Sequence, residues 1–179
     1  MADKQASVFI ATSLDGFIAR ENGDLDWLPV PEPGGEDYGY VAFMASVDAL
    51  VMGRNTYEKA LTFGAWPYAK KRVVVLTTRP LDSPPAGVSV ETMAGEPASV
   101  IERLASNGAP RLYIDGGETI QRFLRAGAIQ RIIVTQIPVL IGRGIPLFGT
   151  LDRDIELTHV STRSWPNGLV QSEYLVAPK

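Results

Sequence analysis

The sequence predicts one α/β domain over residues 1–179, with a mixed, mainly parallel sheet that is flanked by helices. Two observations lead to this fold class. Short, continuous apolar runs alternate along the chain with segments whose apolar residues recur at helical spacing, which is typical of parallel strands buried on both faces. The last two segments instead alternate apolar and polar residues around Pro166-Asn167-Gly168. This pattern predicts an antiparallel hairpin at the C-terminal edge of the sheet.

The first part of the chain is expected to form a strand, a bend and a short strand. Residues 7–11 are an apolar run, Asp15-Gly16 interrupts the pattern, and apolar residues resume at 17–19. The segment 21–35 is rich in glycine, asparagine and proline around Trp27, which predicts a surface loop held by one aromatic side chain. Long loops of this kind often cover a site.

Helices and strands then alternate as far as residue 137. Helices are predicted where apolar residues recur at helical spacing, and strands where apolar or β-branched residues run together. The predicted helices are 36–46, 55–63, 97–107 and 119–125. The predicted strands are 49–52, 72–78, 88–92, 111–114 and 129–137. A loop rich in glycine and proline is expected over 138–149, and the strands of the final hairpin over 155–163 and 168–176.

Composition and charge exclude several classes of function. The chain has no cysteine and a single histidine, His159, so thiol nucleophiles, thiolate metal sites and multi-histidine zinc sites are excluded, and no metal is expected. A formal net charge of −3 argues against nucleic acid or an acidic membrane as a partner. No signal peptide or membrane-spanning apolar segment is evident. We therefore expect a cytoplasmic protein that binds a small molecule.

Three junctions between a strand and the turn that follows it carry groups suited to phosphate. The carboxyl ends of strands in α/β sheets bind ligands because helix N-termini there present free N–H groups. The first junction, Gly53-Arg54-Asn55-Thr56, combines a small residue, a cation and a hydroxyl, although it is equally compatible with a tight turn and a helix cap. The second is Thr77-Thr78-Arg79, and the third is Gly116-Gly117-Glu118-Thr119. Together they indicate a phosphorylated ligand that crosses several strand ends, such as a dinucleotide.

Two acidic residues and one tryptophan are candidates for the reacting end of such a site. Asp15 lies in the bend after the first strand, Asp37 lies near the start of the first helix, and Trp27 lies on the covering loop. Buried carboxylates can supply a proton or anchor a polar heterocycle. The structural alternatives are a turn-forming Asp-Gly for Asp15 and a partner of the helix dipole for Asp37.

Six segments, taken in order, resemble the dihydrofolate reductase-like superfamily over nearly the whole chain. They are SVFIATSLDGFIA, DLDW, MGRNTYE, VVVLTTRP, YIDGGETIQRFL and IIVTQIPVLIGRGIPLFG. The SLDG and IGRGIPLFG elements are more similar to the C-terminal reductase domain of bacterial riboflavin biosynthesis and its stand-alone relatives. The resemblance implies an NADPH site across the three junctions and favours a homodimer. The resemblance implies cofactor contacts at four places. Ala11 and Ile18 would contact the nicotinamide, and Gly53, Arg54 and Thr56 would form the cofactor turn after the strand at 49–52. Thr77, Thr78 and Arg79 would lie near the 2′-phosphate, and Gly116, Gly117, Glu118 and Thr119 would lie at the pyrophosphate.

These observations combine into a reductase hypothesis. NADPH would provide hydride for a C=N or C=O bond of a small heterocycle, such as a pteridine or a ribosylaminopyrimidine-like compound. Asp37 or Asp15 would anchor the substrate or supply the proton, and Trp27 would help exclude water. The alternative is a dinucleotide-binding or structural member of the same superfamily that does not turn over a substrate.

Overall fold

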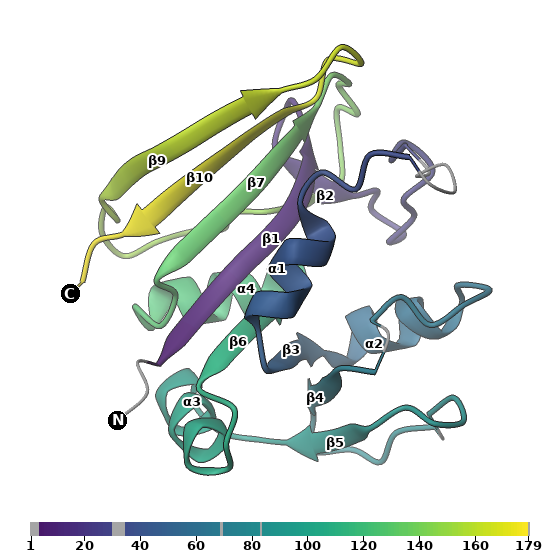
Figure 1. Ribbon diagram of the computed structural model, residues 1–179, viewed down its shortest axis with the longest axis vertical. Coiled ribbons are helices and arrows are strands. Elements are labelled where there is room, and N and C mark those ends of the chain that lie inside the picture. The colour runs from purple at the N-terminus through teal and green to yellow at the C-terminus, as the bar shows by residue number, and fades with distance from the viewer. Residues whose placement is uncertain (1–3, 30–34, 69, 83, 179) are drawn as a thin grey trace.

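The computed structural model describes residues 4–29, 35–68, 70–82 and 84–178. Eight strands of this part of the chain form one sheet in the order β5-β4-β3-β6-β1-β7-β10-β9 (Figure 1). These strands are β1 (Gln5–Ser13), β3 (Ala49–Gly53), β4 (Arg72–Leu76), β5 (Val90–Met93), β6 (Arg111–Asp115), β7 (Arg131–Ile137), β9 (Leu157–Ser164) and β10 (Val170–Val176). The helices are α1 (Tyr40–Ser46), α2 (Arg54–Leu61), α3 (Pro97–Ser106) and α4 (Gly117–Arg125).

The pairing of the strands confirms the predicted sheet. The strand β1 pairs in parallel with β6 and β7, and β3 pairs in parallel with β4 and β6. The strand β10 is antiparallel to both β7 and β9, which makes the expected C-terminal hairpin at one edge. Because the central strands are parallel, their carboxyl ends lie along the same side of the sheet (Figure 1). The helices α2 and α4 begin at this side, directly after β3 and β6.

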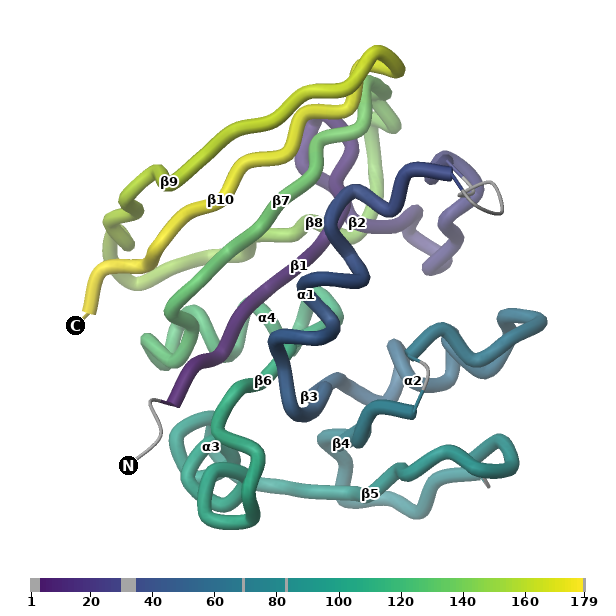
Figure 2. Tube along the Cα trace, in the orientation of Figure 1, coloured from purple at the N-terminus to yellow at the C-terminus, as the bar shows by residue number. Residues whose placement is uncertain are grey.

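The central strand β3 contributes to hydrophobic packing on both faces of the sheet. Leu50 packs in a cluster with Phe43 of α1, whereas Val51 packs in a second cluster with Phe123 of α4. Figures 1 and 2 show α1 in front of the sheet and α4 behind it. Side chains of a strand alternate between the two faces, so a strand covered on both sides is apolar at every position. Full burial of a side chain such as Leu50 contributes roughly 1.5–3 kcal/mol.

The first helix is shorter than predicted and begins at Tyr40. Tyr38 and Gly39 have φ angles of 53° and 84°, which an α-helix does not include. The carboxylate of Asp37 accepts hydrogen bonds from the N–H groups of Gly39 and Val41, at 3.0 and 2.8 Å. The acidic residue thus caps the helix from outside instead of lying within it.

The segment 138–149 was expected to be a loop and instead contains a short strand, β8 (Ile145–Pro146). This strand pairs antiparallel with β2 (Phe17–Ala19). The proline suggested a break in regular structure, but a two-stranded pairing tolerates it because only one edge of the strand is bonded. The buried Leu147 also donates its N–H to the carbonyl oxygen of Gly16. The SLDG bend and the GRGIPLFG segment therefore support each other.

The other predicted helices and strands are present with bounds that shift by at most two residues. Residues 30–34 of the predicted covering loop lie outside the described part of the chain. Within the described ranges, no helix is long and apolar enough to cross a membrane.

Candidate cofactor and substrate site

A cleft of about 940 Å³ opens at the carboxyl ends of β1, β3, β4 and β6. The parallel register brings these ends together, because Met52 lies opposite Asp115 and Gly53 lies opposite Leu76. All three phosphate-compatible junctions therefore face one cleft. Its walls include every residue predicted to bind the cofactor, namely Ala11, Ile18, Gly53, Arg54, Thr56, Thr77, Thr78, Arg79, Gly116, Gly117, Glu118 and Thr119.

Two helix N-termini lie in the wall of this cleft. The N-cap residues are Gly53 for α2 and Gly116 for α4, and neither helix has a hydrogen bond from a capping side chain. The first N–H groups of a helix have no partner within the helix, and the helix dipole adds partial positive charge there. Donors of this kind suit the oxygens of a phosphate or pyrophosphate. The donor set thus fits the diphosphate of a dinucleotide.

The two turns at these N-termini interlock through a reciprocal pairing of glycine with threonine. A Cβ atom on Gly116 would lie 2.2 Å from Oγ1 of Thr56, and a Cβ atom on Gly53 would lie 3.1 Å from Oγ1 of Thr119. Gly116 also has a φ angle of 90°, in the left-handed region that favours glycine. Each turn therefore has a glycine at the position that the threonine of the other turn approaches. The close fit sets the spacing between the two groups of N–H donors.

The cations of the first two junctions differ in how firmly they are held. The guanidinium of Arg54 donates to Oε1 of Glu58 at 2.6 Å and to the carbonyl oxygen of Pro80 at 2.8 Å. Arg79 is exposed, and its guanidinium has no hydrogen bond or ion pair within the described part of the chain. Of these two residues, Arg79 has the guanidinium that is available to an anionic ligand.

A half-buried acid, Asp115, lies in the cleft wall beside Gly116 and was not assigned a role from the sequence. Its Oδ2 accepts a hydrogen bond from the hydroxyl of Tyr68 at 2.9 Å, and its Oδ1 accepts one from the N–H of Gly116 at 2.8 Å. Burial raises the pKa of Asp115, although both hydrogen bonds act in the opposite direction. Tyr68 is itself buried, and desolvation raises the pKa of its hydroxyl, so it remains a donor to the carboxyl group. The sequence signal was an acid that directly follows the apolar residues Leu112, Tyr113 and Ile114 at the end of β6.

The structure places the three residues predicted to be catalytic outside the described lining of the cleft. Asp37 caps α1 as described above. Asp15 accepts hydrogen bonds from the N–H groups of Ile141 and Gly142, at 3.3 and 2.8 Å, and so fastens the segment before β8. Hydrogen bonding, chiefly from Ser13, lowers the pKa of Asp15. Asp15 therefore has the turn-forming position, and Asp37 the position at the start of a helix, that were named as the structural alternatives to a role in the site.

Trp27 lies between two residues, Leu25 and Leu28, that do line the cleft. Its indole Nε1 is buried and has no hydrogen-bond partner among the described residues. The side chain therefore anchors the loop that forms this wall, and its neighbours provide the contact surface.

The strand order and the antiparallel C-terminal strands belong to a dihydrofolate reductase-like α/β fold, as comparison with solved structures shows. The dihydrofolate reductase of Enterococcus faecalis, solved as a complex with NADP(H), has this fold, with a TM-score of 0.63, 19% identity and 96% of each chain covered. The chain belongs to the RibD C-terminal domain family, whose model matches residues 6–171.

Two relatives match this chain over almost their full length. YwjB, an uncharacterized protein of Bacillus subtilis (strain 168), is 37% identical over 179 residues, which cover 98% of this chain and 99% of YwjB. A solved structure from Shewanella sp. PV-4, provisionally named a riboflavin biosynthesis protein, is 41% identical with a TM-score of 0.89. That comparison covers 97% of this chain and 99% of the Shewanella chain.

Proposed function

We propose that the protein is an NADPH-dependent reductase that transfers hydride to a C=N or C=O bond of a small heterocyclic substrate. One observation carries this proposal: a single cleft joins two uncapped helix N-termini to a half-buried carboxyl group whose pKa is raised. The helix N-termini suit the diphosphate of a dinucleotide, and the carboxyl group suits proton transfer. Membership of a family that contains reductases supports the same activity.

Each junction has a separate task in this proposal. The N–H groups that follow Gly53 and Gly116 hold the diphosphate, and Arg79 pairs with the 2′-phosphate that distinguishes NADPH from NADH. The Cδ1 atom of Ile18 lies close to Gly117, at 2.9 Å from where a Cβ atom on that glycine would be. The side chain of Ile18 therefore forms an apolar wall next to the start of α4. NADPH, when bound, supplies the hydride, and the protein orients it toward the substrate.

Asp115 is the group that we propose to supply the proton. Both of its carboxyl oxygens accept hydrogen bonds, from Tyr68 and Gly116, which hold the group in one orientation. Burial favours the protonated form, so the group retains a proton at higher pH than an exposed aspartate does. Tyr68 acts as a positioning residue because it contacts the carboxyl group through its hydroxyl.

Fluorescence titration with NADPH and, separately, with NADH tests the cofactor assignment. Trp66 packs against Tyr68 with ring centroids 5.3 Å apart, so a ligand in the cleft should quench tryptophan emission. We expect NADPH to bind more tightly than NADH, and Arg79→Ala to weaken NADPH alone by roughly 1.5–3 kcal/mol. Equal losses for the two dinucleotides would refute the 2′-phosphate role of Arg79.

An acceptor screen then separates an enzyme from a binding module. Asp115→Asn should preserve dinucleotide binding and remove most of the turnover, because the amide accepts a hydrogen bond from Tyr68 but has no acidic proton. A native protein that binds NADPH and oxidises it with none of the C=N or C=O compounds would favour the non-catalytic alternative.

A further inference from the structure

The loop after β2 is a compact unit with hydrogen bonds of its own. We call residues 20–28 the strap. The N–H of Arg20 donates to the carbonyl oxygen of Asp24 at 2.9 Å. The N–H of Leu28 donates to the carbonyl oxygen of Leu25 at 3.0 Å. None of these short-range bonds has to break when the whole segment changes its position, so the strap is suited to move as one body.

One hydrogen bond joins the strap to the rest of the described chain. Nζ of Lys59, on α2, donates to Oδ1 of Asp24 at 2.8 Å, and the two groups form an ion pair. Within the ranges that the structure describes, no other hydrogen bond or ion pair runs from the strap to another segment. The polar attachment of the strap therefore depends on this single pair.

The Lys59–Asp24 pair connects two walls of the cleft at its rim. Gly23 and Leu25 of the strap line the cleft on one side, and Lys59 and Ala60 of α2 line it on the other. The strap and α2 face each other at the right in Figure 2. The side chains of Lys59 and Asp24 are 34% and 51% exposed, so the pair lies at the surface. A molecule that enters or leaves between the strap and α2 has to pass this pair.

Trp27 is the apolar attachment of the strap, and its indole N–H is left without a hydrogen bond. The Nε1 atom is buried and has no partner among the described residues. A buried donor that has lost its water and gained no acceptor opposes the burial of the ring. The closed position of the strap thus gains the apolar burial of the indole and the Lys59–Asp24 pair, but it loses the hydration of one N–H group.

We infer that the strap opens and closes over the cleft as one unit, and that the Lys59–Asp24 pair is the latch that holds it on α2. This conformational device does not depend on which reaction the cleft carries out. An exposed ion pair is weak, so loss of the latch should raise the population of the open state only about two- to fivefold. Salt screens exposed charges, so the opening of the strap should also respond to ionic strength.

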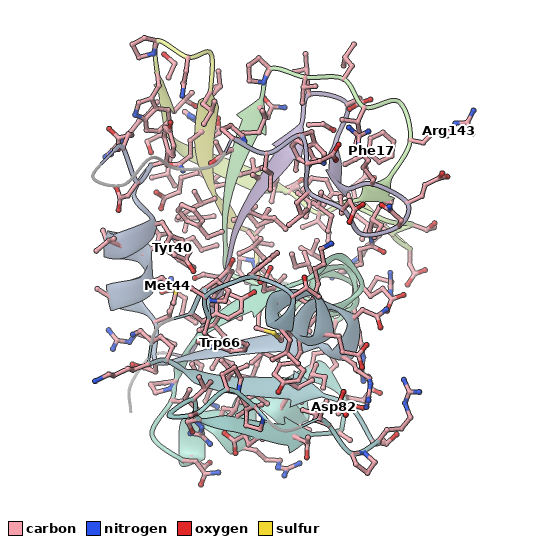
Figure 3. All side chains as sticks on the ribbon, turned by 90° about the vertical axis from the view of Figure 1, so that its right-hand side faces the viewer. Phe17, Tyr40, Met44, Trp66, Asp82 and Arg143 are labelled. Carbon is pink, nitrogen blue, oxygen red and sulfur yellow. The ribbon has the colours of Figure 1, made fainter. Side chains whose placement is uncertain are left out.

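Exchange of the Trp27 indole N–H with water, measured by NMR, tests the latch in the protein without any ligand. The N–H has to reach water to exchange, so its rate follows the population of the open state. Trp66, labelled in Figure 3, is an internal control. Its Nε1 is also buried without a partner among the described residues, but it lies between α2 and β4 and not on the strap. The variant Trp27→Phe assigns the two signals.

Three variants separate loss of the latch from loss of charge. Lys59→Met removes the cation and keeps an unbranched side chain, whereas Lys59→Arg keeps the cation at the same position. Arg20→Met removes the same charge from a pair that lies inside the strap, because Nε of Arg20 is 2.6 Å from Oδ1 of Asp26.

In Lys59→Met the Trp27 N–H should exchange about two- to fivefold faster than in the native protein. Lys59→Arg and Arg20→Met should stay close to the native rate, and the Trp66 N–H should be unaffected throughout. Raising the salt concentration from about 0.1 to about 1 M should accelerate Trp27 exchange in the native protein and not in Lys59→Met. Release of NADPH, followed by stopped-flow fluorescence, should accelerate in Lys59→Met by the same factor as the exchange does.

Each contrary result has a defined meaning. An unchanged Trp27 rate in Lys59→Met, or an equal change at Trp66, would overturn the latch. Equal acceleration in Arg20→Met and Lys59→Met would overturn it too, because the cause would then be charge and not the contact with α2. Faster exchange with unchanged release of NADPH would show that the strap does not gate the cleft. Failure of NADPH to bind at all would refute the reductase proposal and leave the exchange result standing.

Discussion

The substitution Gly116→Ala should be among the most destabilising single changes in the site, for two separable reasons. The φ angle of 90° places an alanine in the left-handed region, which costs roughly 1–2 kcal/mol. Its Cβ atom would lie 2.2 Å from Oγ1 and 3.3 Å from Cβ of Thr56. Overpacking of this kind typically costs about 1–3 kcal/mol. The sum predicts a loss of about 2–5 kcal/mol in the free energy of unfolding.

A matched glycine isolates the backbone contribution. Gly108, which follows α3, has a similar φ angle of 79°, and a Cβ atom there would meet nothing within 4 Å. Gly108→Ala should therefore lose only the backbone part, about 1–2 kcal/mol. The double variant Gly116→Ala with Thr56→Ala should recover part of the overpacking loss, because it removes the atom that Cβ approaches most closely.

Urea unfolding of the single and double variants measures these differences, and the slopes should agree with that of the native protein. The reasoning is refuted if Gly116→Ala is no more destabilising than Gly108→Ala. It is also refuted if Thr56→Ala and Gly116→Ala add independently, because contact between the two positions requires coupling.

Three further predictions concern acidic residues. Asp115→Asn should be at least as stable as the native protein at neutral pH. The raised pKa of Asp115 makes the native protein lose stability as pH rises above the ordinary carboxyl value of 3.8, by up to about 1.4 kcal/mol per pH unit. Urea unfolding across pH checks this prediction, and a stability difference between the two proteins that does not change with pH contradicts it. Asp48→Asn should cost about 1 kcal/mol at neutral pH, since Arg111 bonds both oxygens of Asp48 and lowers its pKa. That contribution is present above the ordinary carboxyl pKa and is lost as pH falls through the lowered value, so the two proteins should converge in acid. Asp37→Ala should lower the urea midpoint by less than Gly116→Ala does and should leave dinucleotide binding unchanged. Weakened dinucleotide binding without a loss of stability would instead show that Asp37 takes part in ligand binding.

The predictions from sequence succeeded where the cause was local. The buried strand β3 was predicted because a strand covered on both faces is apolar at every position. The three turns were located at strand ends that line one cleft because glycine and threonine after an apolar run are typical of a turn, and their binding of a phosphate stays a prediction. The hairpin of β9 and β10 was predicted because its alternation and its Pro-Asn-Gly turn lie within one short segment.

The assignments of the acidic residues needed distances that the sequence does not contain. Asp15 and Asp37 occupied suitable places in the chain, but their carboxylates bond to backbone N–H groups at Gly142 and Val41. Asp115 was adjacent to a recognised junction, yet its partner Tyr68 is 47 residues away in sequence. Without that pairing, an acid at the end of a strand is indistinguishable from a solvated one.

The sequence by itself determined the order of the strands and helices apart from β8, the positions of the phosphate-compatible turns and the absence of cysteine chemistry. Each of these depends on neighbouring residues or on composition. Only the tertiary structure decided which acid lies in the cleft and that Lys59 is neutralised by Asp24, 35 residues earlier. The reason is physical: burial and charge pairing depend on distances through space, and parallel pairing brings together strand ends that are far apart in the chain.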